Sequence, residues 1–194
     1  MPRLSGQLAT TTAVAGIALM GASGFLMFAA AGFSSDVADN PSGLVARGSS
    51  AAELIRWASM VDLVGYLLLA LLAAYFRERF KGDRFIALYT FAGLIYILIG
   101  ATGAVILGTA GPPLMRAYQS ALEPQRGAIT GDFEILYLIV VRGLWQTLEG
   151  IPAAVWLLGV GHTFLRSHAR TQGLLLLALG TLFALITVGR LLSP

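Results

Sequence analysis

The chain has 194 residues, of which 57% are hydrophobic and only 12% are charged, and its mean hydropathy is +0.78. This composition excludes an ordinary water-soluble domain, because too few polar side chains are present to cover a core of that size. The net charge of +3 does not indicate a nucleic-acid partner, since the basic residues lie in short segments between apolar runs, which is the usual pattern of membrane topology. The chain has no cysteine, so disulfides, thiolate nucleophiles and iron–sulfur ligation are excluded as well.

Five apolar runs are each long enough to cross a hydrocarbon core of about 30 Å, which takes about 20 helical residues. They predict an all-α fold, an integral membrane bundle of five transmembrane helices with the lipid bilayer as its partner, in a single domain over residues 1–194. The first run is too long for a signal peptide, so we expect it to be retained as a span. The predicted spans cover residues 8–33, 52–76, 85–110, 132–160 and 172–192.

Local signals mark the second span and the loops. The pattern Ser-Ala-Ala-Glu from Ser50 to Glu53 is a capping box and predicts a helix start. The link from Arg77 to Arg84, RERFKGDR, holds three arginines and a lysine, and residues 162–170 add two arginines. The positive-inside rule places both loops in the cytoplasm, which puts the N-terminus inside and the C-terminus outside in a cell inner (cytoplasmic) membrane.

Small residues recur in two of the spans. In the third they lie on roughly one helical face, at Gly93, Gly100, Ala104 and Gly108. The first span is rich in alanine and also contains Gly16, Gly21 and Gly24. Because small faces let helix backbones approach closely, both spans are predicted to be packing elements inside the bundle.

Between the third and fourth spans, the segment PPLMRAYQSALEPQRG begins with a proline pair, which suits a helix start. Its apolar residues Leu114, Met115, Tyr118 and Leu122 share one face. The pattern predicts a short interfacial helix over residues 112–123 on the outer membrane surface. We interpret it as a connector that rests on the headgroups, with a lid over an outward-facing cavity as the alternative.

The fourth span places polar side chains in a stretch otherwise fit for lipid, VVRGLWQTLEG. Arg142, Gln146 and Glu149 are four and three residues apart and would share one face of an α-helix. A charge at the bilayer centre costs about 2.5–3.5 kcal/mol even on the lenient insertion scale, so this face is predicted to look into the bundle. Pro152 is expected to kink the helix.

The second span offers a partner for these groups. Asp62 lies at about the depth of Arg142, and we predict that the two side chains pair. Glu149 is then left without a counter-charge and must take up a proton or bind a cation. Tyr66, one turn beyond Asp62, is a candidate hydrogen-bond partner. The predicted binding site consists of Asp62, Arg142, Gln146, Glu149 and Tyr66.

Standard catalytic and cofactor motifs are missing from the sequence. The two histidines, His162 and His168, lie at the cytoplasmic end of the fourth span, so neither a metal site nor a haem is expected, and no cofactor is predicted. No GxSxG, HExxH, Walker or Rossmann pattern occurs. We therefore assign no catalytic residue and do not expect an enzyme with a standard nucleophile.

Three functions remain open. The first is a membrane protein that binds or translocates a small ligand, a cation or a proton at the buried carboxylate and arginine residues. The second is a membrane-embedded acid–base isomerase or cyclase of a lipid or terpenoid. The third is a structural or accessory subunit, in which the polar residues only fasten helices together and a second copy or a membrane partner covers an outer face.

The stretch IRWASMVDLVGYLLLALLAAYFRERF, from Ile55 to Phe80, resembles the second span and following basic loop of a family of small bacterial multi-pass membrane proteins classed as a domain of unknown function. The remaining spans are similar to that family in outline. The resemblance implies a helical bundle in a bacterial inner membrane. It implies no activity and no functional residues.

Overall fold

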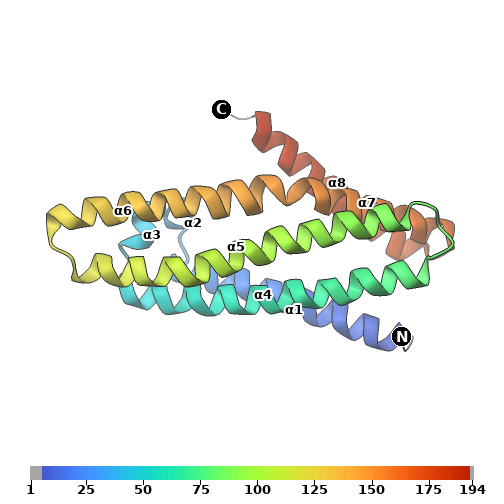
Figure 1. Cartoon of the computed structure of the whole chain (residues 1–194), viewed down its shortest axis with the longest axis horizontal. Helices are drawn as coiled ribbons and strands as arrows, with labels where there is room; N and C mark the ends of the chain where they lie inside the picture. Colours follow the sequence, from blue (N-terminus) through green and yellow to red (C-terminus); the bar gives the residue numbers. More distant parts are fainter. Residues whose placement is uncertain (1–5, 193–194) are drawn as a thin grey trace. The chain divides into compact units, whose positions relative to one another are not determined.

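The computed structural model describes residues 6–192, which are almost entirely helical and contain no strand (Figure 1). The helices are α1 (Gly6–Ala30), α2 (Ser35–Ala38), α3 (Pro41–Val45), α4 (Gly48–Arg79), α5 (Ile86–Ser120), α6 (Glu123–Tyr137), the π-helix η1 (Leu138–Leu148), α7 (Gly150–Arg166) and α8 (Arg170–Leu192). Within these residues, five helical stretches are long and apolar enough to cross a membrane: α1, α4, α5, the run from Glu123 to Arg166, and α8. The predicted all-α fold with five spans is confirmed.

The helices form two compact units, and four of the five spanning stretches contribute to both. The first unit contains, of the described chain, residues 6–15, 66–100 and 144–192. The second unit contains residues 16–65 and 101–143. The boundary therefore passes through α1, α4, α5 and η1, whereas α8 belongs wholly to the first unit.

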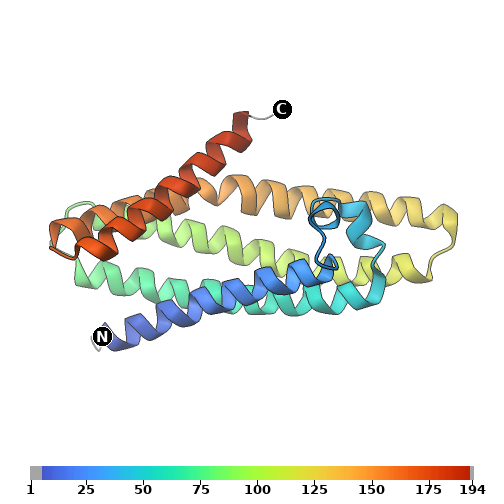
Figure 2. The same ribbon diagram turned by 180° about the vertical axis from the view of Figure 1, so that it is seen from behind.

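In the first unit, α8 packs against α7 (Figure 2). Small residues of both helices lie at this contact, which we name the seam. The buried residues of α8 are Gly173, Gly180 and Thr187, which are spaced seven apart and so return to one side of the helix. A Cβ atom on Gly180 would lie 2.9 Å from the backbone nitrogen of Leu158, and one on Gly173 would lie 2.9 Å from the carbonyl oxygen of Gly161. The two backbones are thus in direct contact, which only glycine allows at these positions.

In the second unit, the connection that carries α2 and α3 is fastened to α6. The short helices begin at the N-caps Ser34 and Asn40, whose side chains accept backbone hydrogen bonds. The Ser42 hydroxyl donates a hydrogen bond to the Glu134 carboxylate. The Tyr137 hydroxyl donates to the carbonyl of Ala38 at 2.8 Å. These bonds explain why a polar connection between two spans has a defined structure.

The predicted separate helix over residues 112–123 is wrong. Residues 112–120 continue α5 without a break, although Pro112 and Pro113 both lie inside it. Proline has no backbone N–H, so the carbonyls of Gly108 and Thr109 lose the hydrogen bonds that residues 112 and 113 would otherwise donate. Helices that are packed against neighbours tolerate this loss. Pro112 is fully buried, so it is part of the packing rather than the start of a surface helix.

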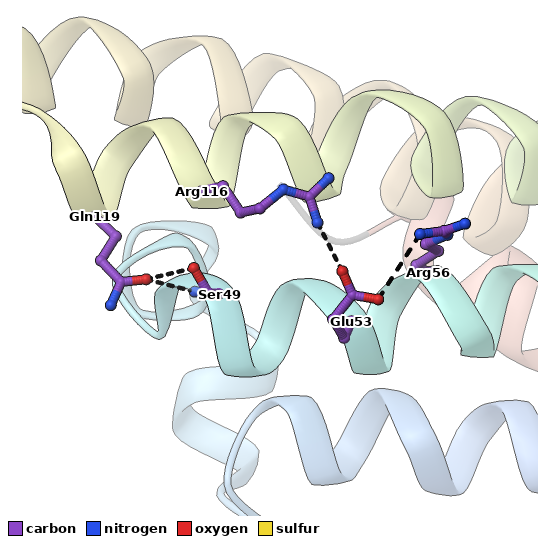
Figure 3. A network of polar contacts seen from close by, with 5 residues as sticks. All are labelled: Ser49, Glu53, Arg56, Arg116 and Gln119. Carbon is purple, nitrogen blue, oxygen red and sulfur yellow. Dashed lines mark hydrogen bonds and ion pairs between the residues drawn. The ribbon is translucent and has the colours of Figure 1, made fainter.

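Polar contacts to α4 hold the extended end of α5 in place (Figure 3). Glu53 accepts a hydrogen bond from Arg116 at 2.7 Å and is 3.9 Å from Arg56. Gln119 accepts from the backbone nitrogen of Ser49 at 2.9 Å and also from its hydroxyl. Residues expected on a membrane surface thus bind the first turns of α4, which is why α5 does not end at its prolines.

The capping box predicted at Ser50 is also wrong. The helix α4 begins at Gly48, whose backbone has a φ of +67°, in the left-handed region that favours glycine. The Ser50 hydroxyl donates to the carbonyl of Arg47 at 3.2 Å instead of capping the helix. Glu53 is likewise not folded back on the helix start, because Arg116 binds it.

The small residues of α5 and α1 behave differently. Gly108 in α5 is a packing position as predicted, since a Cβ atom there would lie 2.7 Å from Cβ of Ser59 in α4. On α1, Gly21 and Gly24 face open space, since a Cβ atom on either would have no heavy atom of a neighbouring helix within 4 Å. The prediction that these glycines pack inside the bundle is therefore wrong, and α1 approaches α4 instead near Gly16, whose carbonyl oxygen would be 3.6 Å from a Cβ on Gly65.

Candidate functional sites

The structure divides the five predicted site residues between its two units. Tyr66, Gln146 and Glu149 belong to the first unit, and Asp62 and Arg142 belong to the second. They make two candidate sites, which we name the Glu149 site and the Asp62 site.

The Glu149 site joins two predicted residues from different helices. Glu149 lies between η1 and α7, and only 7% of its surface is exposed. The hydroxyl of Tyr66, on α4, donates to Oε2 of Glu149 at 3.1 Å and is 3.4 Å from Oε1. Tyr66 is itself 3% exposed, so this hydrogen bond is buried. Tyr66 is thus a hydrogen-bond partner of a predicted site residue, as the sequence indicated.

The helix α5 provides the space through which Tyr66 reaches Glu149. A Cβ atom on Gly100 would overlap the ring of Tyr66, so a glycine is needed where the ring crosses α5. Tyr96, one turn earlier, packs edge-on against Tyr66 with ring centroids 5.7 Å apart. The carbonyl of Gly100 accepts a hydrogen bond from Nε1 of Trp145 at 3.1 Å. The tyrosine ring is therefore held on several sides before it meets the carboxyl group.

The helix α8 closes the same region. A Cβ atom on Gly150 would overlap Oγ1 of Thr187, so α8 lies directly against the residue that follows Glu149. Gln146 contributes its backbone carbonyl, which accepts a hydrogen bond from Arg190 at 3.5 Å. Sequence analysis missed Arg190 and Thr187, although a basic residue inside the last apolar run is a recognisable signal.

The Asp62 site combines one carboxyl group with hydroxyl groups. Asp62, on α4, is 9% exposed, and the side chain of Ser23 on α1 hydrogen-bonds to it. Ser59 precedes Asp62 by three residues on α4 and is 4% exposed. Its Oγ is buried and has no hydrogen-bond partner within the described residues. The pairing of Asp62 with Arg142 stays a prediction, and Arg142 is exposed.

The π-helix explains why the predicted stripe of polar residues did not form. The backbone nitrogen of Glu149 donates to the carbonyl of Leu144, five residues earlier, at 2.9 Å. Closing each turn one residue later gives roughly 4.4 residues per turn instead of 3.6. Spacings of four and three residues then no longer bring Arg142, Gln146 and Glu149 to one face. Arg142 is exposed, Gln146 is half-buried and Glu149 is buried, so the prediction of one inward face is wrong.

Pro152 lies just after this irregular segment, and the kink predicted there stays a prediction. The π-helix lies before the proline, over Leu138–Leu148, and the α-helix resumes at Gly150. The backbone bond from Ala153 to the carbonyl of Glu149 is retained at 3.0 Å. Because π-helical turns widen a helix locally, this segment sets the position from which Glu149 meets Tyr66.

The fold and the sites define a class, an all-α multi-pass membrane protein with buried carboxyl groups in its spanning helices. Comparison of the chain with protein-family models, with curated proteins and with solved structures finds no match. The resemblance described for Ile55–Phe80 stays a prediction. Within the described residues, no three His, Asp or Glu side chains are grouped so that they could hold a metal ion.

Proposed function

We propose that the chain is a multi-pass membrane protein that binds and translocates a proton at its buried carboxyl groups. The observation that carries the proposal is that Glu149 and Asp62, 7% and 9% exposed, both lie in spanning helices and both hydrogen-bond to a hydroxyl group. Ionisable groups inside a membrane are costly, and they commonly mark ion or proton pathways.

The hydroxyl partners suit a group that changes its protonation state. A hydroxyl can donate to a carboxylate, and it can equally accept the proton of a carboxylic acid. The contacts of Tyr66 with Glu149 and of Ser23 with Asp62 can therefore persist through both states.

A proton also suits the packing better than a larger ligand. The structure has a cavity of about 670 Å³, but none of the five predicted site residues lines it. A proton needs no such space, because it travels along hydrogen-bonding groups. An enzyme acting on a lipid or terpenoid would need a pocket faced by both carboxyl groups, and no observation favours that function.

A monovalent cation is the second candidate, and it applies to the Asp62 site. Ser59 has a buried hydroxyl oxygen with no hydrogen-bond partner in the described chain, and it lies one turn from Asp62. Together with Ser23, these side chains offer oxygen atoms, which hard cations prefer as ligands. Sodium is therefore the ion to compare with protons.

We further propose a bacterial inner membrane as the location, with the N-terminus inside and the C-terminus outside. The proposal rests on the arginines in the turns after α4 and α7. The start of α1 lies at the same end of the first unit, since a Cβ atom on Gly6 would be 3.8 Å from the hydroxyl of Tyr75 near the end of α4.

Proton flux into liposomes tests the function. The purified protein is reconstituted with a pH-sensitive dye inside, and a potassium diffusion potential drives the flux. We expect flux from the wild type, its loss in Glu149→Gln and Asp62→Asn, and no change in Glu53→Gln, a control at an exposed carboxylate. Circular dichroism confirms that each variant is folded.

Flux no greater than in protein-free liposomes, or flux that both Glu149→Gln and Asp62→Asn retain, would overturn the proposal. The same liposomes are then tested for uptake of radioactive sodium. Sodium uptake that Asp62→Asn abolishes, without proton flux in the wild type, would establish the cation candidate instead.

A further inference from the structure

A basic cavity lies at one end of the first unit, and none of its lining residues belongs to the Glu149 site or the Asp62 site. It is formed by the end of α4, the turn that follows it, and the end of α7, and its volume is about 670 Å³. The lining residues are Arg79, Phe80, Gly82, Asp83, Arg84, Phe85, Thr163, Arg166 and Ser167. We name it the arginine pocket.

The pocket carries an excess of positive charge. Three arginines and one aspartate line it, which gives a net charge of +2. The Asp83 side chain is only 13% exposed and is committed to holding the walls together. Its Oδ1 accepts from the backbone nitrogen of Phe85 at 2.9 Å, and its Oδ2 accepts from Thr163 at 3.3 Å and is 4.0 Å from Arg166. Asp83 therefore partly neutralises Arg166 and joins the turn to α7.

The other two arginines are held by aromatic rings rather than by acids. Arg84 has its guanidinium carbon 4.5 Å from the centroid of the Phe85 ring. Arg79 lies 5.5 Å from the Phe80 ring and 6.0 Å from the Phe164 ring, and one of its terminal nitrogens donates to the hydroxyl of Tyr75 at 3.1 Å. Neither arginine forms an ion pair within the described residues. A guanidinium that rests on a ring face keeps its N–H edge available for hydrogen bonds.

We propose that the arginine pocket binds a phosphate group. A guanidinium fork matches two oxygens of a phosphate, and Arg84 and Arg79 supply the donors. The hydroxyls of Thr163 and Ser167 already donate to the carbonyls of Gly159 and Phe164, so the arginines carry the binding. The ends of α4 and α7 contribute the negative poles of their helix dipoles, and the start of α5 at Ile86 contributes a positive pole, so the three arginines are the full positive charges of the pocket. Substitutions of these side chains are for this reason a direct test.

The position of the pocket favours an anionic phospholipid as the source of the phosphate. The pocket lies where two spanning stretches end, and Phe80 and Phe85 line it together with the arginines. Headgroup phosphates lie at this depth, and basic pockets between spanning helices bind anionic headgroups there. A soluble phosphate ester offers the same chemical group, so the experiment must separate the two sources.

The test measures lipid binding by the full-length protein in nanodiscs. Binding of a fluorescent phosphatidylglycerol is compared with binding of the matching phosphatidylcholine. Removal of one fork in Arg84→Gln should weaken phosphatidylglycerol binding by about tenfold. The matched control is Arg170→Gln, which removes the same charge from the start of α8 but does not line the pocket, and which should change binding less than about twofold.

A second variant separates charge from geometry. Arg84→Lys keeps the charge and loses the planar fork, so it should restore only part of the binding. Equal losses in Arg84→Gln and Arg170→Gln would overturn the proposal, because they indicate a diffuse attraction to basic loops. Binding of phosphatidylcholine as strong as that of phosphatidylglycerol would overturn it as well.

Competition identifies the source of the phosphate. Displacement of the lipid by millimolar glycerol phosphate, lost in Arg84→Gln, would uphold the phosphate site and assign it to a soluble ester. Failure of glycerol phosphate to compete would uphold the lipid. Neither result depends on proton flux, so the pocket can be tested whether or not the proposed function holds.

Discussion

Substitution of Tyr66 by phenylalanine isolates the hydrogen bond of the Glu149 site. The change removes the hydroxyl that donates to Oε2 at 3.1 Å, and it leaves the ring that packs against Tyr96 and Gly100. No cavity is created, so the loss is that of the hydrogen bond. Bonds between membrane helices measured by double-mutant cycles are worth about 0.6 kcal/mol on average and about 1.7 kcal/mol at most. We therefore expect Tyr66→Phe to destabilise the protein by about 0.6–1.7 kcal/mol.

The measurement is reversible unfolding in mixed micelles, with the denaturing detergent increased stepwise and helicity followed by circular dichroism. A double-mutant cycle combines Tyr66→Phe with Glu149→Met, which removes both acceptor oxygens at nearly constant length. The control is Tyr89→Phe, because the hydroxyl of this half-buried tyrosine makes no hydrogen bond within the described residues. A coupling energy near zero, or an equal loss in Tyr89→Phe, would refute the assigned contact.

Three further substitutions test packing and surface charge by the same unfolding measurement. Gly180→Leu should separate α8 from α7 and lower the free energy of unfolding by about 2 kcal/mol or more. Its control is Gly189→Leu, at a position that faces open space, which should lower it by less than about 0.5 kcal/mol. Similar values for the two variants would contradict close packing at Gly180. Gly100→Ala should lower the free energy of unfolding by about 1–3 kcal/mol, because the added methyl group overlaps the Tyr66 ring. The control Gly21→Ala should leave that free energy unchanged or raise it. No loss in Gly100→Ala would show that the ring does not cross α5 at this position. Glu53→Gln breaks half-exposed ion pairs and should lower the free energy of unfolding by about 0–1 kcal/mol, and by less at high salt. A larger loss that does not depend on salt would be inconsistent with the exposure of these side chains.

The number and approximate position of the spans could be predicted because hydropathy and length decide them. A run of about 20 apolar residues has few alternatives to a spanning helix, since its backbone must satisfy its own hydrogen bonds in lipid. The ends were less predictable. The helix α5 continues past Pro112 to Ser120 because residues of α4, distant in sequence, bind Arg116 and Gln119. No local pattern in the segment contains that information.

The positions of small residues predicted only some of the helix contacts, because those contacts also depend on residues distant in sequence. A glycine shows that a backbone can be approached, but not that a neighbour approaches it. Gly108 meets Ser59 and Gly100 meets Tyr66, whereas Gly21 meets nothing within 4 Å. The seven-residue repeat in α8 could not be recognised from glycines alone, because its third member is Thr187, a small residue that packs but is not a glycine.

Residue spacing could predict only part of the candidate site. Asp62, Tyr66 and Glu149 could be chosen as candidates from their residue types alone, because polar groups in apolar runs need a partner. Their arrangement could not be found, since the prediction assumed α-helical turns where the chain forms a π-helix over Leu138–Leu148. Arg142 is exposed in this segment, and Glu149 accepts a hydrogen bond from the hydroxyl of Tyr66.

A purely structural role, in which the buried carboxyl groups only form hydrogen bonds between helices, makes a distinct prediction. If Glu149 served only to hold Tyr66, then Tyr66→Phe and Glu149→Met would lower stability by similar amounts, and neither would affect proton flux. If Glu149 carries the proton, Tyr66→Phe leaves the carboxyl group in place and should reduce flux only in part. Glu149→Gln should abolish flux while keeping an oxygen that can accept from Tyr66. Because glutamine preserves the hydrogen bond and removes the titration, a stable but inactive Glu149→Gln protein separates the two roles in one variant.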